Sequence, residues 1–365
     1  LYSVIGLSVV LNLFNVDWMY KGFENYAYIT KRSIAFKLIS LATLFLLVHK
    51  ASDYITYGFV QVIALSGSNI VNVFTAKKYV HLYFKGLNLR KHLRSIFVLF
   101  SSVVVINVYT NMDSTMLGII SGQKYVGYYA AANKINGVII GIVTSLGVVL
   151  YPRLSYYIKH DLHREFNLLI LKSVHMVIMV SIPACVGLFI LAPQVINILS
   201  GTGFTPAITT MRIQILIILF VGISNLTGIQ ILLPLGKERD FLVSVLSGAC
   251  LDFLLNLFLI PHFQQNGAAL SSTIAELFVA IVQIYYTRRY IKGKILNMRN
   301  VHYIIASVIM SLCVIGIVHM KMGNILTLLI GTLAGTAIYA LYNFISQDPI
   351  IMEIIRKVNN KFQIK

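Results

Sequence analysis

The segment LLILKSVHMVIMVSIPACVGLFILA, residues 168–192, decides the fold of this chain. Lys172 is the one charged residue within it. A helix rises 1.5 Å per residue, so a segment of this length is longer than the hydrocarbon core of a bilayer, which is about 30 Å thick. A long apolar run with so little charge is typical of a transmembrane helix. We therefore predict that residues 168–192 cross a membrane.

The same pattern recurs along the whole chain. Of its 365 residues, 58% are hydrophobic and 12% are charged, whereas a soluble domain has about 25% charged residues. We predict an all-α polytopic membrane protein. Its eleven predicted spans are 1–16, 34–49, 55–75, 95–111, 126–151, 168–192, 209–233, 241–260, 267–287, 302–319 and 324–345. The apolar stretch 113–122 is too short to cross, so we expect it to be interfacial or re-entrant.

The basic residues lie in the loops between the apolar segments and give the chain a net charge of +18. Loops on alternate sides differ strongly, with 25 Lys and Arg residues in one set and 4 in the other. The positive-inside rule places the basic set, and with it the C-terminus, in the cytoplasm. This predicts a multi-pass protein of the bacterial cell (inner) membrane. Because the basic residues do not gather on one face, the pattern argues against nucleic-acid binding.

Ionisable residues inside predicted spans are candidates for function, because each costs roughly 2.5–3.5 kcal/mol to insert. Lys134 follows Tyr129 and Asn133 in the 126–151 span. It could extend its side chain to the outer interface, or it could face a water-filled cavity and attract an anionic substrate.

Two further spans carry acidic residues. Asp252 and Asn256 are one helical turn apart and share a face of the 241–260 span. Glu276 lies in the middle of the 267–287 span, one turn after Thr273. These residues could line a cavity or bind a coupling ion, or they could form hydrogen bonds that fix the helix bundle.

A polar cluster follows the first predicted span. Asp17 and Glu24 are expected to pair with Lys21 or Lys31 at the membrane interface. Trp18 is the single tryptophan, and its place at the end of a span is typical of the aromatic belt.

The sequence predicts no enzyme. It contains no GxxxxGK[ST], HExxH or GxSxG motif, and its loops are short. A polysaccharide polymerase or ligase would need a large outer loop rich in Arg and His. No metal or organic cofactor is indicated.

Three segments carry a resemblance to a known family. They are DWMYKGFEN (17–25), VGYYAAANKI (126–135) followed by YPRLS (151–155), and NLFLIP (256–261) followed by GAA (267–269) and Glu276. In this order they resemble segments of the oligosaccharide repeat-unit flippases, the Wzx-type polysaccharide biosynthesis proteins of the MOP exporter superfamily. Gln264 and Gln265 replace a Gly that the family has after Phe263, which we take as a minor departure.

The resemblance implies a two-lobed MOP/MATE-like bundle in which the eleven spans are helices 4–14 of fourteen. It divides the chain into the rest of the N-terminal lobe (1–75), a basic cytoplasmic linker (76–94), the C-terminal lobe (95–290), two additional helices (301–346) and a basic tail (347–365). Since Leu1 opens inside an apolar segment, the resemblance also implies that the first three helices are missing.

The implied function is to flip undecaprenyl-pyrophosphate-linked oligosaccharides by alternating access, for O-antigen, capsule or exopolysaccharide synthesis. Membrane lipids, a polysaccharide polymerase and the chain-length machinery are the implied partners. An H⁺ or Na⁺ gradient or the membrane potential could drive the cycle. A lipid II flippase or a MATE-like multidrug exporter is the alternative.

The resemblance also assigns roles to residues. Lys134 is expected to bind the substrate headgroup, and Asp252 and Glu276 are expected to couple ions or line the cavity. The predicted interface or gate residues are Asp17, Trp18, Glu24 and Arg153.

Overall fold

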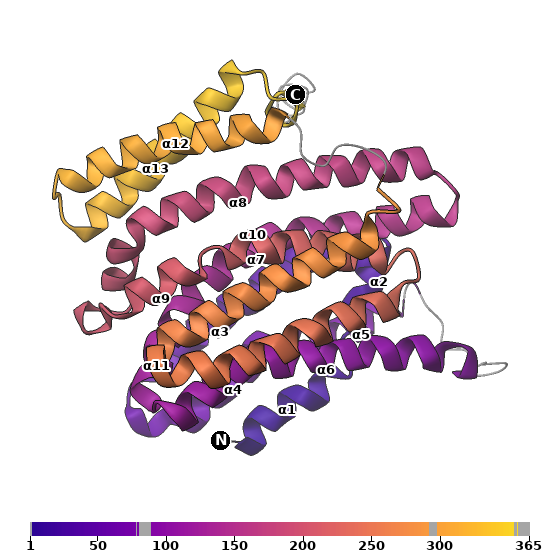
Figure 1. The fold of residues 1–365 in the computed structure, drawn as a ribbon. Helices are drawn as coiled ribbons and strands as arrows, with labels where there is room; N and C mark the ends of the chain where they lie inside the picture. Colours follow the sequence, from indigo (N-terminus) through magenta and orange to yellow (C-terminus); the bar gives the residue numbers. More distant parts are fainter. Residues whose placement is uncertain (1, 78, 80–88, 292–297, 354–355, 357–365) are drawn as a thin grey trace, which may run out of the picture. The chain divides into compact units, whose positions relative to one another are not determined.

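The computed structural model describes residues 2–77, 79, 89–291, 298–353 and 356, and its regular elements there are all helical (Figure 1). The elements are α1 (Tyr2–Asn12), α2 (Asp17–Gly22), α3 (Tyr26–Leu47), η1 (Ala51–Asp53), α4 (Tyr54–Val62), η2 (Ile63–Gly67), α5 (Ser68–Ala76), α6 (Leu89–Ile120), α7 (Gln123–Lys159), α8 (His163–Leu199), η3 (Thr202–Phe204), α9 (Ala207–Gln214), α10 (Ile217–Ser224), η4 (Asn225–Leu232), α11 (Glu238–Thr287), α12 (Met298–His319) and α13 (Asn324–Ile345). Here η1 and η3 are short 3₁₀ helices, and η2 and η4 are π-helical.

The chain forms two compact units, Leu1–Leu89 and Arg90–Lys365, which we call unit 1 and unit 2. Unit 1 contains α1 to α5, and unit 2 contains the elements from α6 to α13. The boundary falls within the basic segment 76–94. Residues 80–88 of that predicted linker, and most of the predicted tail after residue 353, lie outside the described residues.

Eight helices in the described part of the chain are long and apolar enough to cross a membrane. They cover 54–76, 95–120, 123–159, 163–199, 207–232, 238–287, 300–319 and 324–345. The 238–287 helix is broken at Gln264 and therefore contains two of the predicted spans, 241–260 and 267–287. Two predicted spans, 1–16 and 34–49, have no counterpart among the eight helices. They fall in α1 and α3, which do not meet the criteria of length and hydropathy.

The expectation for residues 113–122 is wrong. Instead of an interfacial or re-entrant stretch, they continue α6 as one helix as far as Ile120. The chain turns only at Gly122, whose φ of 99° suits glycine, and α7 begins at the next residue. Asp113 therefore lies inside a span of 95–120 and not at its end.

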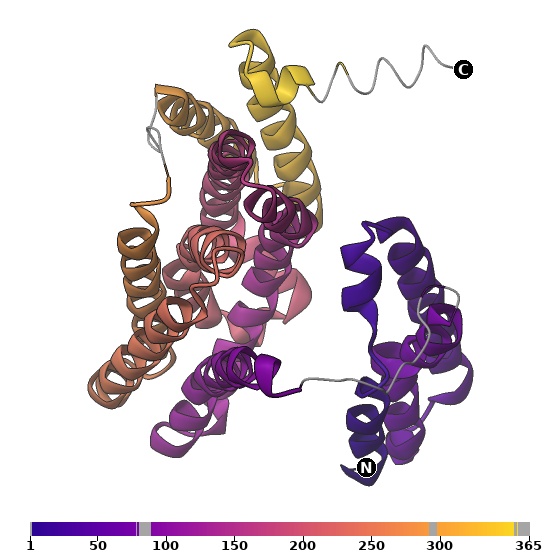
Figure 2. The ribbon, with the colours of Figure 1, turned by 90° about the vertical axis from the view of Figure 1, so that its right-hand side faces the viewer.

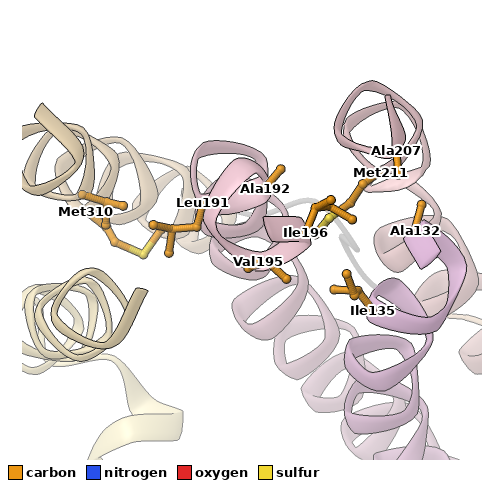
Figure 3. Close-up of a cluster of buried hydrophobic side chains, with 10 residues drawn as sticks. Ala132, Ile135, Leu191, Ala192, Val195, Ile196, Ala207, Met211 and Met310 are labelled. Carbon is orange, nitrogen blue, oxygen red and sulfur yellow. The ribbon is translucent and has the colours of Figure 1, made fainter. Parts of the chain in front are cut away.

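One cluster of buried hydrophobic side chains in unit 2 joins α7, α8, α9 and α12. Figure 3 shows Ile135 of α7 and Met211 of α9 close to Ile196 of α8, and Leu191 of α8 close to Met310 of α12. Helices α12 and α13 pack against each other and both pack against α8 (Figure 1, Figure 2).

The segment that follows α13 is held to the rest of unit 2 by polar contacts. The Tyr303 hydroxyl donates to Asp348 Oδ2 at 2.8 Å, and Lys172 pairs with Glu353. These contacts hold the start of the predicted basic tail against α8 and α12.

The 207–232 span is interrupted between α9 and α10. The break frees backbone carbonyls, which neighbouring helices satisfy: Thr273 donates its hydroxyl to Ile213 O at 3.3 Å, and the Cys185 thiol donates to Ile215 O at 3.2 Å. Irregular backbone within a membrane is tolerated where protein groups satisfy it in this way.

Gln264 forms the kink of α11 with φ 47° and ψ −127°. An L-residue is strained there, whereas glycine adopts such a conformation readily. Our interpretation of the missing family glycine as a minor departure is therefore wrong, because this chain places a strained glutamine at the turn.

Replacing Gln264 by glycine is expected to stabilise the protein by about 1 kcal/mol, the scale of the strain of a left-handed L-residue. Thermal unfolding in detergent measures the change. Gln265→Gly is the matched control, since Gln265 is buried and is not among the residues with positive φ. It is expected to lower the unfolding temperature. An unfolding temperature of Gln264→Gly at or below that of the wild type would contradict the assignment of strain.

Candidate functional site: a carboxyl-lined cavity

Asp113 of α6 is buried at the meeting point of α6, α7 and both halves of α11. Its Oδ1 accepts a hydrogen bond from Asn256 Nδ2 at 2.6 Å. Its Oδ2 accepts from the hydroxyls of Tyr129 at 2.5 Å and Ser272 at 2.6 Å. Donors from three helical segments thus surround one carboxylate, an arrangement that stabilises its negative charge.

Asp252 lies beside this group and is fully buried. It is within hydrogen-bonding reach of Asp113, and its Oδ2 accepts from Asn256 Nδ2 at 3.2 Å. Within the described part of the chain, neither its Oδ1 nor Asn256 Oδ1 has a hydrogen-bond partner. Two adjoining carboxyl groups in a low-dielectric interior need a positive charge between them, either a proton or a bound cation. The free oxygens are the groups that could bind it.

A second contact between α6 and α11 lies one helical turn away. The Tyr109 hydroxyl donates to Glu276 Oε1 at 3.0 Å. Tyr109 is buried and Glu276 is half-buried.

Both contacts border one cavity of about 340 Å³ inside unit 2. Among the described residues its wall includes no Lys, Arg or His. The cavity therefore carries negative charge without a basic counterpart. Its polar lining residues are Tyr109, Thr110, Asp113, Tyr129, Asn133, Ser224, Asn225, Ser272, Glu276 and Gln283.

The structure brings most of the predicted unit 2 residues to this cavity. Tyr129, Asn133 and Glu276 line it, and Asp252 and Asn256 adjoin it through Asp113. In the described part of the chain, no group of three or more His, Cys, Asp or Glu residues is arranged to hold a metal ion. The polar groups that line the cavity are carboxyl, hydroxyl and amide groups, which suit a proton or a hard cation better than a soft transition metal.

Lys134 is not part of the cavity wall. Its side chain is exposed on unit 2, with no ion-pair or hydrogen-bond partner among the described residues. Gly137 and Gly141 follow it on the same exposed side of α7, and both have open space where a side chain would lie. The surface around Lys134 is consequently uncrowded.

Asp17, one of the predicted interface residues, has a different partner from the lysines that the sequence suggested. Asp17 pairs with the buried Arg32, whose Nη2 lies 2.9 Å from Asp17 Oδ1, and not with Lys21 or Lys31. Asn72 donates to the same carboxylate at 2.6 Å and also accepts from Arg32.

Tyr20 completes this group by donating its hydroxyl to Asn72 O at 3.2 Å. Burial raises the pKa of Tyr20 to about 12, so the phenol stays protonated at neutral pH. These contacts join α2, α3 and α5 within unit 1.

The other predicted interface residues do not join this group. Trp18 is 71% exposed, as a membrane-belt residue would be. Glu24 stands at a positive φ of 54°, and Arg153 is exposed on unit 2.

Sequence reasoning missed Asp113, Tyr109 and Ser272. The sequence does not single out Asp113, because the pattern of residues 113–122 predicts an interfacial segment. An aspartate that interrupts an apolar run was the available signal. Ser272 carries no such signal, because a serine hydroxyl in a helix is most often bonded to its own backbone. Tyr109 carries none because it is one of 21 tyrosines in the chain.

Comparisons with known proteins agree with this architecture. Residues 1–158 match the family model described as polysaccharide biosynthesis protein. A candidate O-antigen transporter of Escherichia coli (strain K12) is 26% identical over 288 residues, which cover 77% of this chain and 68% of that protein. A candidate low-salt glycan biosynthesis flippase of Haloferax volcanii is 21% identical over 70% of this chain and 55% of its own length.

Among solved structures, the lipid II flippase MurJ in its inward closed conformation matches with a TM-score of 0.64. The match has 18% identity and covers 86% of this chain and 67% of that one. At this identity the likeness shows the fold. The spans and the fold define a multi-pass membrane protein, and its relatives are flippases and transporters, not enzymes. Over residues 1–158 the chain is similar to the polysaccharide biosynthesis proteins, and its relatives of known description are distant.

Proposed function

We propose that the protein flips undecaprenyl-pyrophosphate-linked oligosaccharide repeat units across the bacterial inner membrane by alternating access. The products would serve O-antigen, capsule or exopolysaccharide synthesis. The observation that carries the proposal is the buried Asp113–Asp252 pair, which borders a cavity without a basic residue in its described wall. Ionisable groups kept inside spans at such cost are typical of ion-coupled transporters.

The coupling step follows from the charge of the site. Without a bound ion, the two carboxyl groups repel and strain the contact between α6 and α11. A proton or Na⁺ relieves this repulsion, so the ion binds more tightly to the conformation in which the helices close around it. An ion shifts a conformational equilibrium by its difference in affinity for the two states. A gradient of that ion would therefore drive the cycle.

Lys134 is the residue that we assign to the substrate headgroup. A pyrophosphate carries several negative oxygens, and a lysine ammonium is a strong donor to them. The exposed position of Lys134 and the open surface at Gly137 and Gly141 leave room for such a group. Following the basic loops, we place the C-terminus in the cytoplasm. Lipids surround the spans, and a polysaccharide polymerase with its chain-length machinery would consume the product.

The test is to replace Lys134 by alanine in the protein expressed from its complete gene, in cells that lack the native copy. We expect surface polysaccharide to fall to the level of cells without the gene, while the protein inserts normally. Lys134→Arg keeps the positive charge and is expected to retain most of the polysaccharide. Lys124→Ala, at an exposed position at the start of the same helix, is the matched control and should resemble wild type.

The results of this experiment test the role of Lys134 and distinguish an oligosaccharide flippase from a lipid II flippase. Wild-type polysaccharide in Lys134→Ala would remove Lys134 from the mechanism. Normal polysaccharide in cells without the gene, combined with loss of cell-wall precursors outside the cell, would instead favour the lipid II flippase.

A further inference from the structure

Helices α6 and α11 contact each other at two levels along their length, and at each level a carboxyl group is hydrogen-bonded to a hydroxyl group. At the first level Asp113 of α6 accepts from Ser272 of α11, and at the second Tyr109 of α6 donates to Glu276 of α11. Asp113 follows Tyr109 by four residues, and Glu276 follows Ser272 by four residues. At 1.5 Å per residue, the two levels are about 6 Å apart along the helices. Each level pairs one carboxyl group with a hydroxyl on the opposite helix.

The two levels are separate in their hydrogen bonding. Asp113 and Asp252 share Asn256 as a donor, whereas Glu276 accepts its one hydrogen bond among the described residues from Tyr109. Glu276 is also half-buried, while Asp252 is fully buried. The free side of Glu276 is therefore accessible from the cavity independently of the Asp252 oxygens.

The described side chains that face the cavity are acidic or uncharged. The titratable groups on the wall are Asp113, Glu276 and the phenols of Tyr109 and Tyr129, and Asp252 adjoins them. No Lys, Arg or His stands among the described wall residues. One positive charge at the Asp113–Asp252 pair offsets one of its two negative charges, and the three donors to Asp113 stabilise the other. Glu276 is left with one donor, Tyr109, and no counter-charge. A carboxylate inside a span without such a partner is too costly to persist.

The shape of the cavity allows a second ion to enter. From the two acidic levels it extends to Ser224, Asn225 and Gln283, whose polar groups lie on its wall. At about 30 Å³ of liquid volume per water molecule, its 340 Å³ have room for about ten water molecules. A proton or monovalent cation can thus reach Glu276 without displacing the ion at Asp252.

We propose that the cavity of unit 2 binds two monovalent positive charges in each cycle, one at the Asp113–Asp252 pair and one at Glu276 with Tyr109. This inference rests on the proposed ion-coupled flipping and adds the number of coupling charges and the residue that holds the second. Each charge is a proton or an alkali cation.

The number of charges can be counted directly. The full-length protein is reconstituted in vesicles with a lipid-linked oligosaccharide. Proton uptake is followed with a pH-sensitive dye, and sodium uptake with radioactive sodium, for each substrate flipped. We expect the two counts to add to two in the wild type and to one in Glu276→Gln. Glu238→Gln, a carboxyl removed from the same α11 outside the cavity wall, is the matched control and should keep two. A total of one in the wild type, or of two in Glu276→Gln, overturns the proposal.

A second measurement separates this proposal from the flipping itself. The purified protein is held at alkaline pH without alkali cations and is then brought to neutral pH in sodium buffer without substrate, and ion uptake is counted by the same two methods. Glu276→Gln is expected to take up one positive charge fewer than wild type, and Glu238→Gln the same number as wild type. Equal uptake in all three proteins refutes the second site. If the wild type flips no substrate but this difference appears, the proposed flipping fails while the second ion site stands.

Discussion

Replacing Asp113 by asparagine is expected to abolish ion-driven transport while leaving the protein folded. Asparagine has nearly the same shape and can still accept hydrogen bonds through its carbonyl oxygen from Tyr129, Ser272 or Asn256. It removes one of the two negative charges and with it the repulsion that a bound ion relieves, while Asp252 keeps its single charge. Surface polysaccharide should fall to the level of cells without the gene, and uptake of the ion by the purified protein should decrease by one charge.

Asp113→Ala separates the charge of this residue from its structural role. Alanine leaves three buried donors without their acceptor. Each donor keeps a second partner, in Ala268 O, Asp252 or Ser272, so the loss is that of the hydrogen bonds to a charged acceptor. Such bonds contribute about 1.5–3 kcal/mol each, and we expect a loss of stability of about 3 kcal/mol. Thermal unfolding in detergent measures the loss. If Asp113→Asn transports normally, the ion does not bind at this carboxylate. If Asp113→Ala unfolds at the wild-type temperature, the hydrogen-bond network does not support the fold.

Gly267→Ala is the second change with a large expected effect, and here the effect is on folding. A methyl group at this position would lie 2.2 Å from Leu259 O and 2.5 Å from Leu259 C, both backbone atoms of the preceding half of α11. Neither atom can move without separating the two halves of the helix. Since overpacking a tight contact costs about 1–3 kcal/mol and occasionally more, we expect a loss of about 3 kcal/mol. Less folded protein in the membrane and a lower unfolding temperature would show it.

The same substitution at an open glycine is the control for this prediction. Gly316 lies within α12, and nothing is within 4 Å of the position that a methyl group would occupy. Gly316→Ala should be neutral or should stabilise the helix by about 0.5–1 kcal/mol. Equal stability of the two variants would show that the halves of α11 are not packed as closely as the structure indicates.

Part of the carboxyl-lined cavity could be predicted from the sequence. Asp252, Asn256 and Glu276 attract attention because polar and charged groups in apolar runs are costly, and all three lie in or beside the cavity. Lys134 attracts attention for the same reason, yet its exposed side chain is not part of the cavity wall. The cost of a charge in a span shows that a residue needs a reason to be there. It does not show which way its side chain faces.

The sequence by itself determined that this protein is helical and spans a membrane many times, because long uncharged segments leave the chain no other stable environment. Only the tertiary structure decided that Asp113 joins Asp252, that Asp17 pairs with Arg32, and that Gln264 forms a strained turn. Asp113 and Asp252 are separated by much of the chain, and their contact depends on how α6 packs against α11. Hydropathy measures the transfer of one segment from water to lipid and carries no information on such packing.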